Sequence, residues 1–296
     1  MKRPPGKLKE EFGQAGWGIK EAVKDKCVLC GSKNFKRLFS VEGKNIVRCG
    51  RCGLVRTESF SEPDYKKYHR DQEYQKFETH FRNIFLKRVQ IVEKFFPEHG
   101  KVLEIGCSVG LLLSLLKEKG WEVWGVEPSK SADVAGKKGI KIVNEVFEKA
   151  TLPNSYFDLI ILNHTLEHLN NPLEILRKAR PLLRKGGKIF VDVPNFASLS
   201  SGLLGQRWPY LAPSEHLHHF EPKTLKKLIK MAGFKVIFES SHSGIFDLGS
   251  PVKGLYDELL SRPRSFVKYL ITAPWAYLTT LMGRGISLTV VGETRY

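Results

Sequence analysis

The chain has 296 residues, which is enough for one large hydrophobic core and a small additional unit. Its hydrophobic content of 42% is ordinary for a soluble protein, and its polar start argues against a secretory signal. The net charge of +17 is uneven, because residues 1–56 alone contain 14 Lys or Arg against 5 Asp or Glu. This bias predicts a polyanionic neighbour, namely nucleic acid, an anionic membrane surface or a phosphorylated substrate. A solvated Lys-rich surface is the alternative.

Residues 1–24 begin MKRPPGKLKE and are rich in Lys, Gly and Pro, a composition that predicts a flexible basic segment. The segment lacks the apolar stretch of a secretory signal, so we expect a cytoplasmic protein with reduced thiols. Because a basic segment is attracted to anionic lipids, the inner face of the membrane is an alternative location.

Four of the five cysteines form two Cys-x-x-Cys pairs, each followed by Gly: Cys27 with Cys30, and Cys49 with Cys52. This spacing is typical of a four-thiolate zinc site, and the glycines allow the left-handed turns of two knuckles. The segment between the pairs reads as two short strands around Glu42 and Gly43. We therefore predict a structural zinc ribbon at residues 25–58, folded with the help of its metal. Two disulfides or four free thiols are the alternative.

Residues 59–98 combine aromatic and charged side chains. From Phe77 onward the apolar positions recur at helical spacing, which predicts a helix packed on the sheet that follows. Three tyrosines precede it: Tyr65, Tyr68 and Tyr74. They form either a lid over a ligand or a contact between the two units.

A strand, a tight turn and a helix are predicted next, at Val102–Ile105, Gly106–Gly110 and Leu111–Lys119. Small residues at the turn let the backbone approach a ligand. Glu127 closes the next apolar stretch, where a carboxylate can accept both hydroxyls of a ribose. The sequence therefore predicts a nucleoside-binding edge of a sheet.

The turn is not the dinucleotide fingerprint, because Ser108 and the residues after it break Gly-x-Gly-x-x-Gly. It carries Glu104, which suits a cationic ligand better than a pyrophosphate. Together with Glu127, this strand and turn resemble motifs I and II of class I S-adenosylmethionine (SAM)-dependent methyltransferases.

Three later segments resemble the same family in the same order. Residues 154–169 resemble its fourth strand and following loop, residues 182–194 its fifth strand, and residues 215–236 the approach to its sixth strand. Alternation of strand and helix also predicts a parallel sheet by itself. The resemblance implies an α/β fold over residues 99–296: a Rossmann-like, mostly parallel seven-stranded sheet with helices on both faces.

The resemblance implies SAM as cofactor, bound at the carboxyl edge of the sheet. Phe147 and Glu148 are the nearest matches to its adenine-contacting segment, and Cys107 is expected to fill space beside the cofactor. The expected cofactor-binding residues are Glu104, Gly106, Cys107, Ser108, Gly110, Glu127, Phe147, Glu148 and Asn163.

Residues 245–285 interrupt the alternation and predict a helical insertion before a last strand at Ile286–Val291. The apolar stretch Phe266–Met282 contains Lys268 and Pro274 and is short for a membrane-spanning helix. A helical cover over the substrate site or a dimer interface is favoured. Peripheral membrane contact through residues 264–284 is the alternative, because arginines flank the stretch and it contains Trp and Tyr.

Methyl transfer is an in-line displacement in which the cofactor supplies the activated methyl, and the protein supplies orientation and sometimes a base. Two histidine clusters suit that role. His164, Glu167 and His168 follow the fourth predicted strand, and His216 precedes a later helix. We expect His168, Glu167 and His216 to act in catalysis. Loop-stabilising hydrogen bonds, or a divalent metal as in some quinone O-methyltransferases, are the alternatives.

A zinc ribbon ahead of this core is similar to methyltransferases associated with sugars and surface polysaccharides. The resemblance implies methyl transfer to a small-molecule acceptor, namely a sugar, a nucleotide-sugar or a lipid-linked glycan. An RNA methyltransferase that uses the basic ribbon as a clamp is the second hypothesis, although the loop at His164 lacks a stacking aromatic. A non-catalytic zinc-ribbon module is the third. The sequence does not indicate an oligomeric state.

Overall fold

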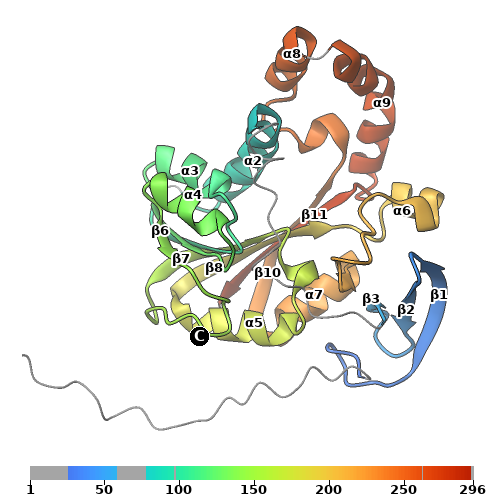
Figure 1. The fold of residues 1–296 in the computed structure, drawn as a ribbon, viewed down its shortest axis with the longest axis horizontal. Helices are drawn as coiled ribbons and strands as arrows, with labels where there is room; N and C mark the ends of the chain where they lie inside the picture. Colours follow the sequence, from blue (N-terminus) through green and yellow to red (C-terminus); the bar gives the residue numbers. More distant parts are fainter. Residues whose placement is uncertain (1–25, 59–77, 97, 262, 295–296) are drawn as a thin grey trace, which may run out of the picture.

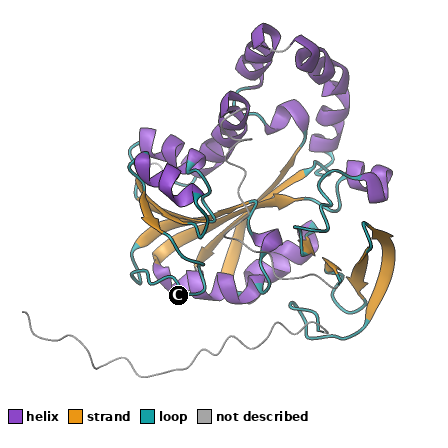
Figure 2. Ribbon diagram, viewed as in Figure 1, coloured by secondary structure: helices purple, strands orange, loops and turns teal. Residues whose placement is uncertain are grey.

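The computed structural model describes residues 26–58, 78–96, 98–261 and 263–294. The predicted flexible segment at residues 1–24 and the three tyrosines before Phe77 lie outside these residues. Figures 1 and 2 show a central twisted sheet with helices on both sides, and a smaller sheet beside it.

The central sheet has seven strands in the order β10-β11-β8-β7-β4-β5-β6. Six strands run in the same direction, and β11 lies antiparallel between β10 and β8. The predicted Rossmann-like sheet is therefore confirmed. The strands are β4 (Lys101–Ile105), β5 (Glu122–Val126), β6 (Lys141–Val143), β7 (Phe157–Asn163), β8 (Leu183–Pro194), β10 (Phe234–His242) and β11 (Ser287–Thr294).

Each face of this sheet has its own hydrophobic core. On one face lie α2 (Glu78–Glu93), α3 (Leu111–Glu118) and α4 (Ser131–Lys137), and on the other lie α5 (Pro172–Ala179) and α7 (Pro222–Met231) (Figure 1). Strands buried on both faces must be apolar throughout, as β7 is over its whole length apart from Asp158 and Asn163.

A second sheet has four strands in the order β1-β2-β3-β9, all antiparallel. The two strands expected around Glu42 and Gly43 are β1 (Phe35–Val41) and β2 (Lys44–Cys49), joined by a turn with both residues at positive φ. β3 (Val55–Thr57) then pairs with β9 (His218–His219), which comes from the main body of the chain. The ribbon's sheet is thus completed by a strand more than 160 residues away.

The predicted insertion at residues 245–285 is helical. It contains the 3₁₀ turn η4 (Gly244–Asp247) and two helices, α8 (Pro251–Ser261) and α9 (Pro263–Leu281), which project from the top of the molecule in Figure 1. Pro274 lies inside α9. No helix among the described residues has the length and apolar character needed to cross a membrane. The last strand, β11, begins one residue later than predicted and runs three residues further.

Candidate active site

A cavity of about 690 Å³ opens at the carboxyl ends of β4, β5 and β7. Ligands of open α/β sheets bind at this edge. Its walls come from the turn after β4, the residues after β5 and β7, the segment before β9, and α2. Most of the predicted cofactor-binding residues and all three predicted catalytic residues line it.

The turn after β4 has the tight geometry that the sequence indicated. Gly106 has φ of 74°, and a Cβ there would lie 2.8 Å from the Thr165 side chain, so only glycine fits beneath the loop after β7. Gly110 directly precedes α3 as its N-cap and lies in the left-handed region, and a Cβ there would meet Ile140. Gly110 does not line the cavity; its position shapes the turn.

Ser108 stands in this turn with φ of 48°, a region that costs a non-glycine residue about 1–2 kcal/mol. His164, with φ of 51°, and Ala212, with φ of 36°, also line the cavity. Three of the five described non-glycine residues at positive φ therefore surround one cavity. Strained backbone of this kind concentrates at functional sites.

Glu127 lies directly after β5 and is 8% exposed. One oxygen accepts a hydrogen bond from the Ser108 backbone N–H and the other from that of Ser129, each at 2.9 Å. The carboxylate is thereby held rigidly at the cavity wall. Each oxygen has a further lone pair, so the pair can still accept the two hydroxyls of a ribose.

Glu104 and Cys107 lie beneath the turn, in a small recess that shares Gly106, Ser108 and Asn163 with the main cavity wall. Burial, with the charge of Glu127, raises the pKa of Glu104 well above its ordinary value, and Oε2 has no hydrogen-bond partner. A cationic group nearby would satisfy this buried oxygen and restore its charge. The turn therefore suits the amino group of SAM.

Cys107 packs against the strand β5, because a Cβ on Gly125 would lie 2.5 Å from its sulfur. Burial raises the pKa of this thiol well above its ordinary value, so it stays protonated. Its position agrees with a space-filling role beside the cofactor and not with a nucleophile.

The predicted adenine-side residues Phe147 and Glu148 line the other end of the cavity. Phe147 is buried, and the ammonium of Lys178 lies 5.2 Å from its ring centroid. Lys178 also donates to the backbone carbonyls of both residues, which fixes the segment. Asn163, at the end of β7, is buried in the recess with Glu104 and Cys107, and its Oδ1 lacks a partner among the described residues.

His164, Glu167, His168 and His216 all line the cavity. Glu167 and His168 lie on the 3₁₀ turn η1 (Leu166–His168) after β7. The rings of His168 and His216 meet edge to face with centroids 4.8 Å apart. One ligand atom from each of Glu167, His168 and His216 lies within 4.8 Å of the others, so the three could also hold a metal ion.

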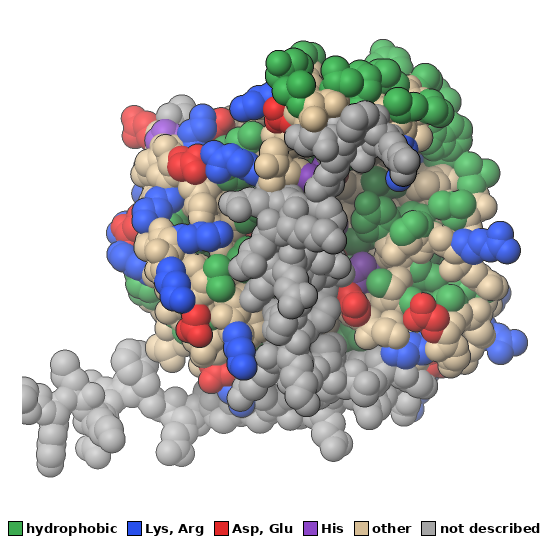
Figure 3. All heavy atoms as spheres, turned by 45° about the horizontal axis from the view of Figure 1, so that its top comes forward, with side chains coloured by type: hydrophobic (Ala, Val, Ile, Leu, Met, Phe, Trp, Pro, Cys, Tyr) green, Lys and Arg blue, Asp and Glu red, His purple; other side chains and the backbone are tan. Residues whose placement is uncertain are grey.

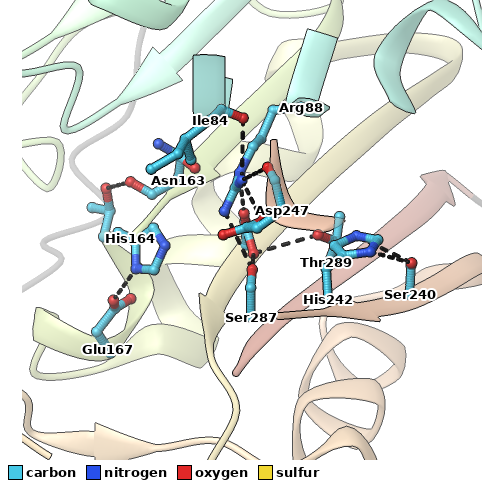
Figure 4. A network of polar contacts seen from close by, with 12 residues as sticks. Ile84, Arg88, Asn163, His164, Glu167, Ser240, His242, Asp247, Ser287 and Thr289 are labelled. Carbon is cyan, nitrogen blue, oxygen red and sulfur yellow. Dashed lines mark hydrogen bonds and ion pairs between the residues drawn. The ribbon is translucent and has the colours of Figure 1, made fainter. Parts of the chain in front are cut away.

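Glu167 is the charged centre of this cluster. It is 1% exposed, and burial alone would raise its pKa, but the contact from His164 and the charges of His168, His164 and His216 outweigh it and lower the pKa to about 2. His164 Nδ1 lies 3.3 Å from its Oε1 (Figure 4). Beyond this contact, neither oxygen receives a hydrogen bond from the described residues. A buried carboxylate thus faces the cavity with acceptor capacity to spare.

Two backbone carbonyls set the tautomers of the neighbouring rings. His168 Nδ1 donates to the Glu215 carbonyl at 3.0 Å, and His216 Nδ1 donates to the Tyr210 carbonyl at 2.9 Å. In the neutral rings the basic lone pair then lies on Nε2. Burial lowers the pKa of His216 to about 4, so this ring is neutral at pH 7.

A buried ion-pair network that was not predicted from the sequence lies beside this cluster (Figure 4). Arg88 of α2 is 2% exposed; its Nε lies 2.6 Å from Asp192 Oδ2, and its Nη1 lies 2.6 Å from Asp247 Oδ1. Ser287 donates to Asp192 at 2.7 Å. Arg88 and Asp247 line the cavity.

The sequence did carry a signal for this network. Arg88 stands on the apolar stripe of its helix, four residues after Ile84, and Asp192 stands inside an apolar strand. A charge at a buried position needs a partner of opposite charge. The sequence could not say that Asp247, from the insertion, completes the group.

The four ribbon cysteines converge. Cys27 and Cys52 Sγ lie 3.4 Å apart, Cys30 and Cys49 Sγ lie 3.5 Å apart, and all four sulfurs lie within 4.8 Å of one another. Four thiolates around zinc at about 2.3 Å would be about 3.8 Å apart, so the arrangement fits a tetrahedral zinc and leaves no disulfide. Gly31 and Gly53, after each pair, have the positive φ predicted for the two knuckles.

The ribbon also contacts the segment that carries His216. Thr57 Oγ1 donates to the His216 carbonyl at 2.8 Å and lies 3.1 Å from His219 Nε2. Arg48 forms two hydrogen bonds with Glu221, at 3.1 and 2.7 Å. His219 and the adjacent His218 are buried packing residues and do not line the cavity.

Comparisons with known proteins agree with this geometry. A ubiquinone biosynthesis O-methyltransferase of Idiomarina loihiensis is 28% identical over 188 residues, 58% of this chain and 73% of that protein. An uncharacterised protein of Methanocaldococcus jannaschii is 26% identical over 167 residues, 56% of this chain and 79% of its own length. The structure of a possible histamine N-methyltransferase of Thermotoga maritima has a TM-score of 0.55 at 20% identity, covering 76% of this chain and 96% of that one, which indicates a shared fold.

The family model of the methyltransferase domain matches residues 74–239, more than half of the chain. That span includes the turn after β4, Glu127 and the cluster at Glu167. With the seven-stranded fold and a cavity suited to SAM, the match shows that the chain belongs to the methyltransferase-domain family and is a SAM-dependent methyltransferase.

Proposed function

We propose that the enzyme methylates a hydroxyl group of a sugar, a nucleotide-sugar or a lipid-linked glycan. The observation that carries this proposal is the arrangement at the cavity wall: a buried ionised carboxylate, Glu167, beside the imidazole rings of His168 and His216. A hydroxyl is a weak nucleophile unless its proton is removed as the new bond forms. A carboxylate and a neutral imidazole together provide for that removal.

SAM supplies an electrophilic methyl group carried on a sulfonium. The chain's own residues must bind the hydroxyl, aim it and take its proton. In the proposal His168 Nε2 receives the proton, Glu167 stabilises the resulting imidazolium, and His216 packs edge to face on the His168 ring and limits its motion.

The remaining polar groups of the cavity suit an acceptor with several hydroxyls. Asp247, anchored by Arg88 at 2.6 Å, offers carboxylate oxygens, and His164 and Tyr210 add further hydrogen-bonding groups. Ring hydroxyls of a sugar match such a wall, because each can donate to a carboxylate oxygen or accept from a neighbouring donor. The name of the Idiomarina relative, a ubiquinone biosynthesis O-methyltransferase, is consistent with a small-molecule hydroxyl acceptor.

The decisive experiment is transfer of radiolabelled methyl from SAM into a fractionated cell extract, separated into RNA, soluble nucleotide-sugars and lipid-extractable glycans. We expect label in one of the two sugar-containing fractions. Label that ribonuclease destroys would overturn the proposal and favour an RNA acceptor held by the basic ribbon.

The proposed base can be tested separately. His168→Gln should lower kcat by about 10²–10⁴, the usual contribution of a general base, while the Kd for SAM stays unchanged. His99→Gln is the matched control, because His99 does not line the cavity. Equal kcat values for the two variants would exclude His168 as the base.

A further inference from the structure

The helix α9 exposes its large apolar side chains to solvent, whereas an ordinary surface helix buries them. Its large apolar side chains face outward and recur at helical spacing: Val267, Leu270, Ile271, Trp275, Leu278 and Leu281. Ile271 is 73% exposed and Leu281 66%. The side that packs on the protein instead carries the buried Ala276 and Thr279. A surface helix normally directs its apolar stripe toward the core.

The neighbouring helix α8 extends this surface. Val252, Tyr256, Leu259 and Leu260 are exposed at spacings of three, four and eight residues, with Val252 at 82%. Figure 3 shows hydrophobic side chains gathered along the upper edge of the molecule, over α8 and α9. A contiguous apolar surface of this kind marks an interaction site.

Charge indicates what this surface binds. Among the described side chains of residues 251–285, three are basic and exposed: Lys253, Lys268 and Arg284. The one acidic side chain among them, Asp257, receives a long hydrogen bond from Asn83 of α2, at 3.5 Å. The chain as a whole carries +17. A second copy would bring the same positive charge to the contact, whereas an anionic lipid surface would attract it.

The aromatic side chains favour the same partner. The hairpin formed by α8 and α9 exposes three aromatic side chains: Tyr256, Trp275 and Tyr277. Trp and Tyr prefer the boundary between lipid tails and headgroups. Neither described helix is able to span a bilayer, so the hairpin would lie in the plane of its surface.

We propose that α8 and α9 form a docking surface for an anionic lipid bilayer, with the outward apolar stripe inserted among the headgroups. This docking is independent of which acceptor the enzyme methylates. No described residue of α8 or α9 lines the cavity, so the cavity lining gives no support to a cover over the substrate site, one of the two roles that the sequence favoured beside a dimer interface.

The hairpin nevertheless borders the cavity through α2 and η4. Phe246 of η4 packs on Tyr277 with ring centroids 5.6 Å apart, and the next residue, Asp247, lines the cavity. Phe81, Ile84 and Phe85 of α2 form an apolar wall on the same side. Resting on the function proposed above, this placement favours the lipid-linked glycan among its three acceptor classes.

The test is cosedimentation of the full chain with vesicles of phosphatidylcholine containing about a third phosphatidylglycerol. We expect binding that weakens in pure phosphatidylcholine and at high salt. Ile271→Glu with Leu278→Glu should lower the vesicle partition coefficient at least about tenfold, because both side chains leave the inserted stripe and two negative charges are added. Both positions are exposed, so the variant should keep its circular dichroism and its affinity for SAM.

The matched control is Leu38→Glu with Met231→Glu, which adds the same charge at exposed apolar positions on β1 and α7. It should bind vesicles nearly as the wild type does. Equal binding by the two double variants, or no binding by the wild type, would overturn the docking surface. A wild-type dimer that the hairpin variant dissociates, without vesicle binding, would assign the surface to a second copy. Methyl transfer to a soluble sugar acceptor would stand in either case, so failure of the docking surface and failure of the proposed function are distinguishable.

Discussion

Replacing Thr57 by Val should show whether the zinc ribbon supports the active site. Thr57 is fully buried on β3, and its hydroxyl donates to the His216 carbonyl at 2.8 Å while lying 3.1 Å from His219 Nε2. Val has nearly the same shape and keeps the backbone hydrogen bond to Leu217, at 3.0 Å. The variant therefore removes the hydroxyl and little else.

The expected cost follows from the groups left without their partner. The His216 carbonyl loses its donor, and the His219 ring loses its acceptor. Because both groups are buried, each lost hydrogen bond lowers the stability by about 1–3 kcal/mol. We expect Thr57→Val to lower the free energy of unfolding by about 2–6 kcal/mol. It should also lower kcat more than it weakens SAM binding, because His216 belongs to the cluster with His168 and Glu167 and not to the turn after β4.

Urea unfolding and calorimetric titration with SAM measure the two effects. Thr57→Ser is the control, because it keeps the hydroxyl and loses only a methyl group, at about 1 kcal/mol. If Thr57→Val were as stable as the wild type, or more stable than Thr57→Ser, the hydrogen bonds would not be what joins the ribbon to the His216 segment.

Three further predictions concern the cavity. Glu127→Ala should weaken SAM binding at least about tenfold, since a hydrogen bond to a charged group contributes about 1.5–3 kcal/mol; an unchanged calorimetric affinity would exclude the ribose role. Ser108→Gly should raise the free energy of unfolding by about 0.5–1 kcal/mol, because relief of the positive φ exceeds the extra entropy of unfolded glycine; a lower Tm would contradict it. Burial lowers the pKa of His216 and His218 to about 4 and of His219 to about 3, whereas unfolded histidine titrates near 6.5. The unfolded state then binds more protons between these values, so the free energy of unfolding should fall as the pH drops from 6.5 toward 4; equal values at about pH 7 and 5 would refute it.

The parts of the fold that the sequence predicted are those set by neighbouring residues. Local patterns specify the first unit of the sheet: an apolar run gives β4, small residues give the turn, and a helix with one apolar face gives α3. Alternation of such units leaves a parallel sheet as the only compact arrangement. The two cysteine pairs likewise predicted their own convergence, because a metal site needs four thiolates at short range. The apolar stretch Phe266–Met282 predicted the helical character of the insertion but not its division into α8 and α9, and the sequence favoured a cover or a dimer interface for it.

The contacts between distant segments were decided by the tertiary structure alone. No local pattern pairs β3 with β9, since each is at most three residues long and draws its register from the packing around it. The joining of Arg88, Asp192 and Asp247 depends on three elements, α2, β8 and η4, that lie far apart in the sequence. Sequence periodicity fixes which face of an element is buried. It does not fix which partner covers that face, because many partners bury similar apolar area, and the choice among them rests on the shape and charge of the whole assembled chain.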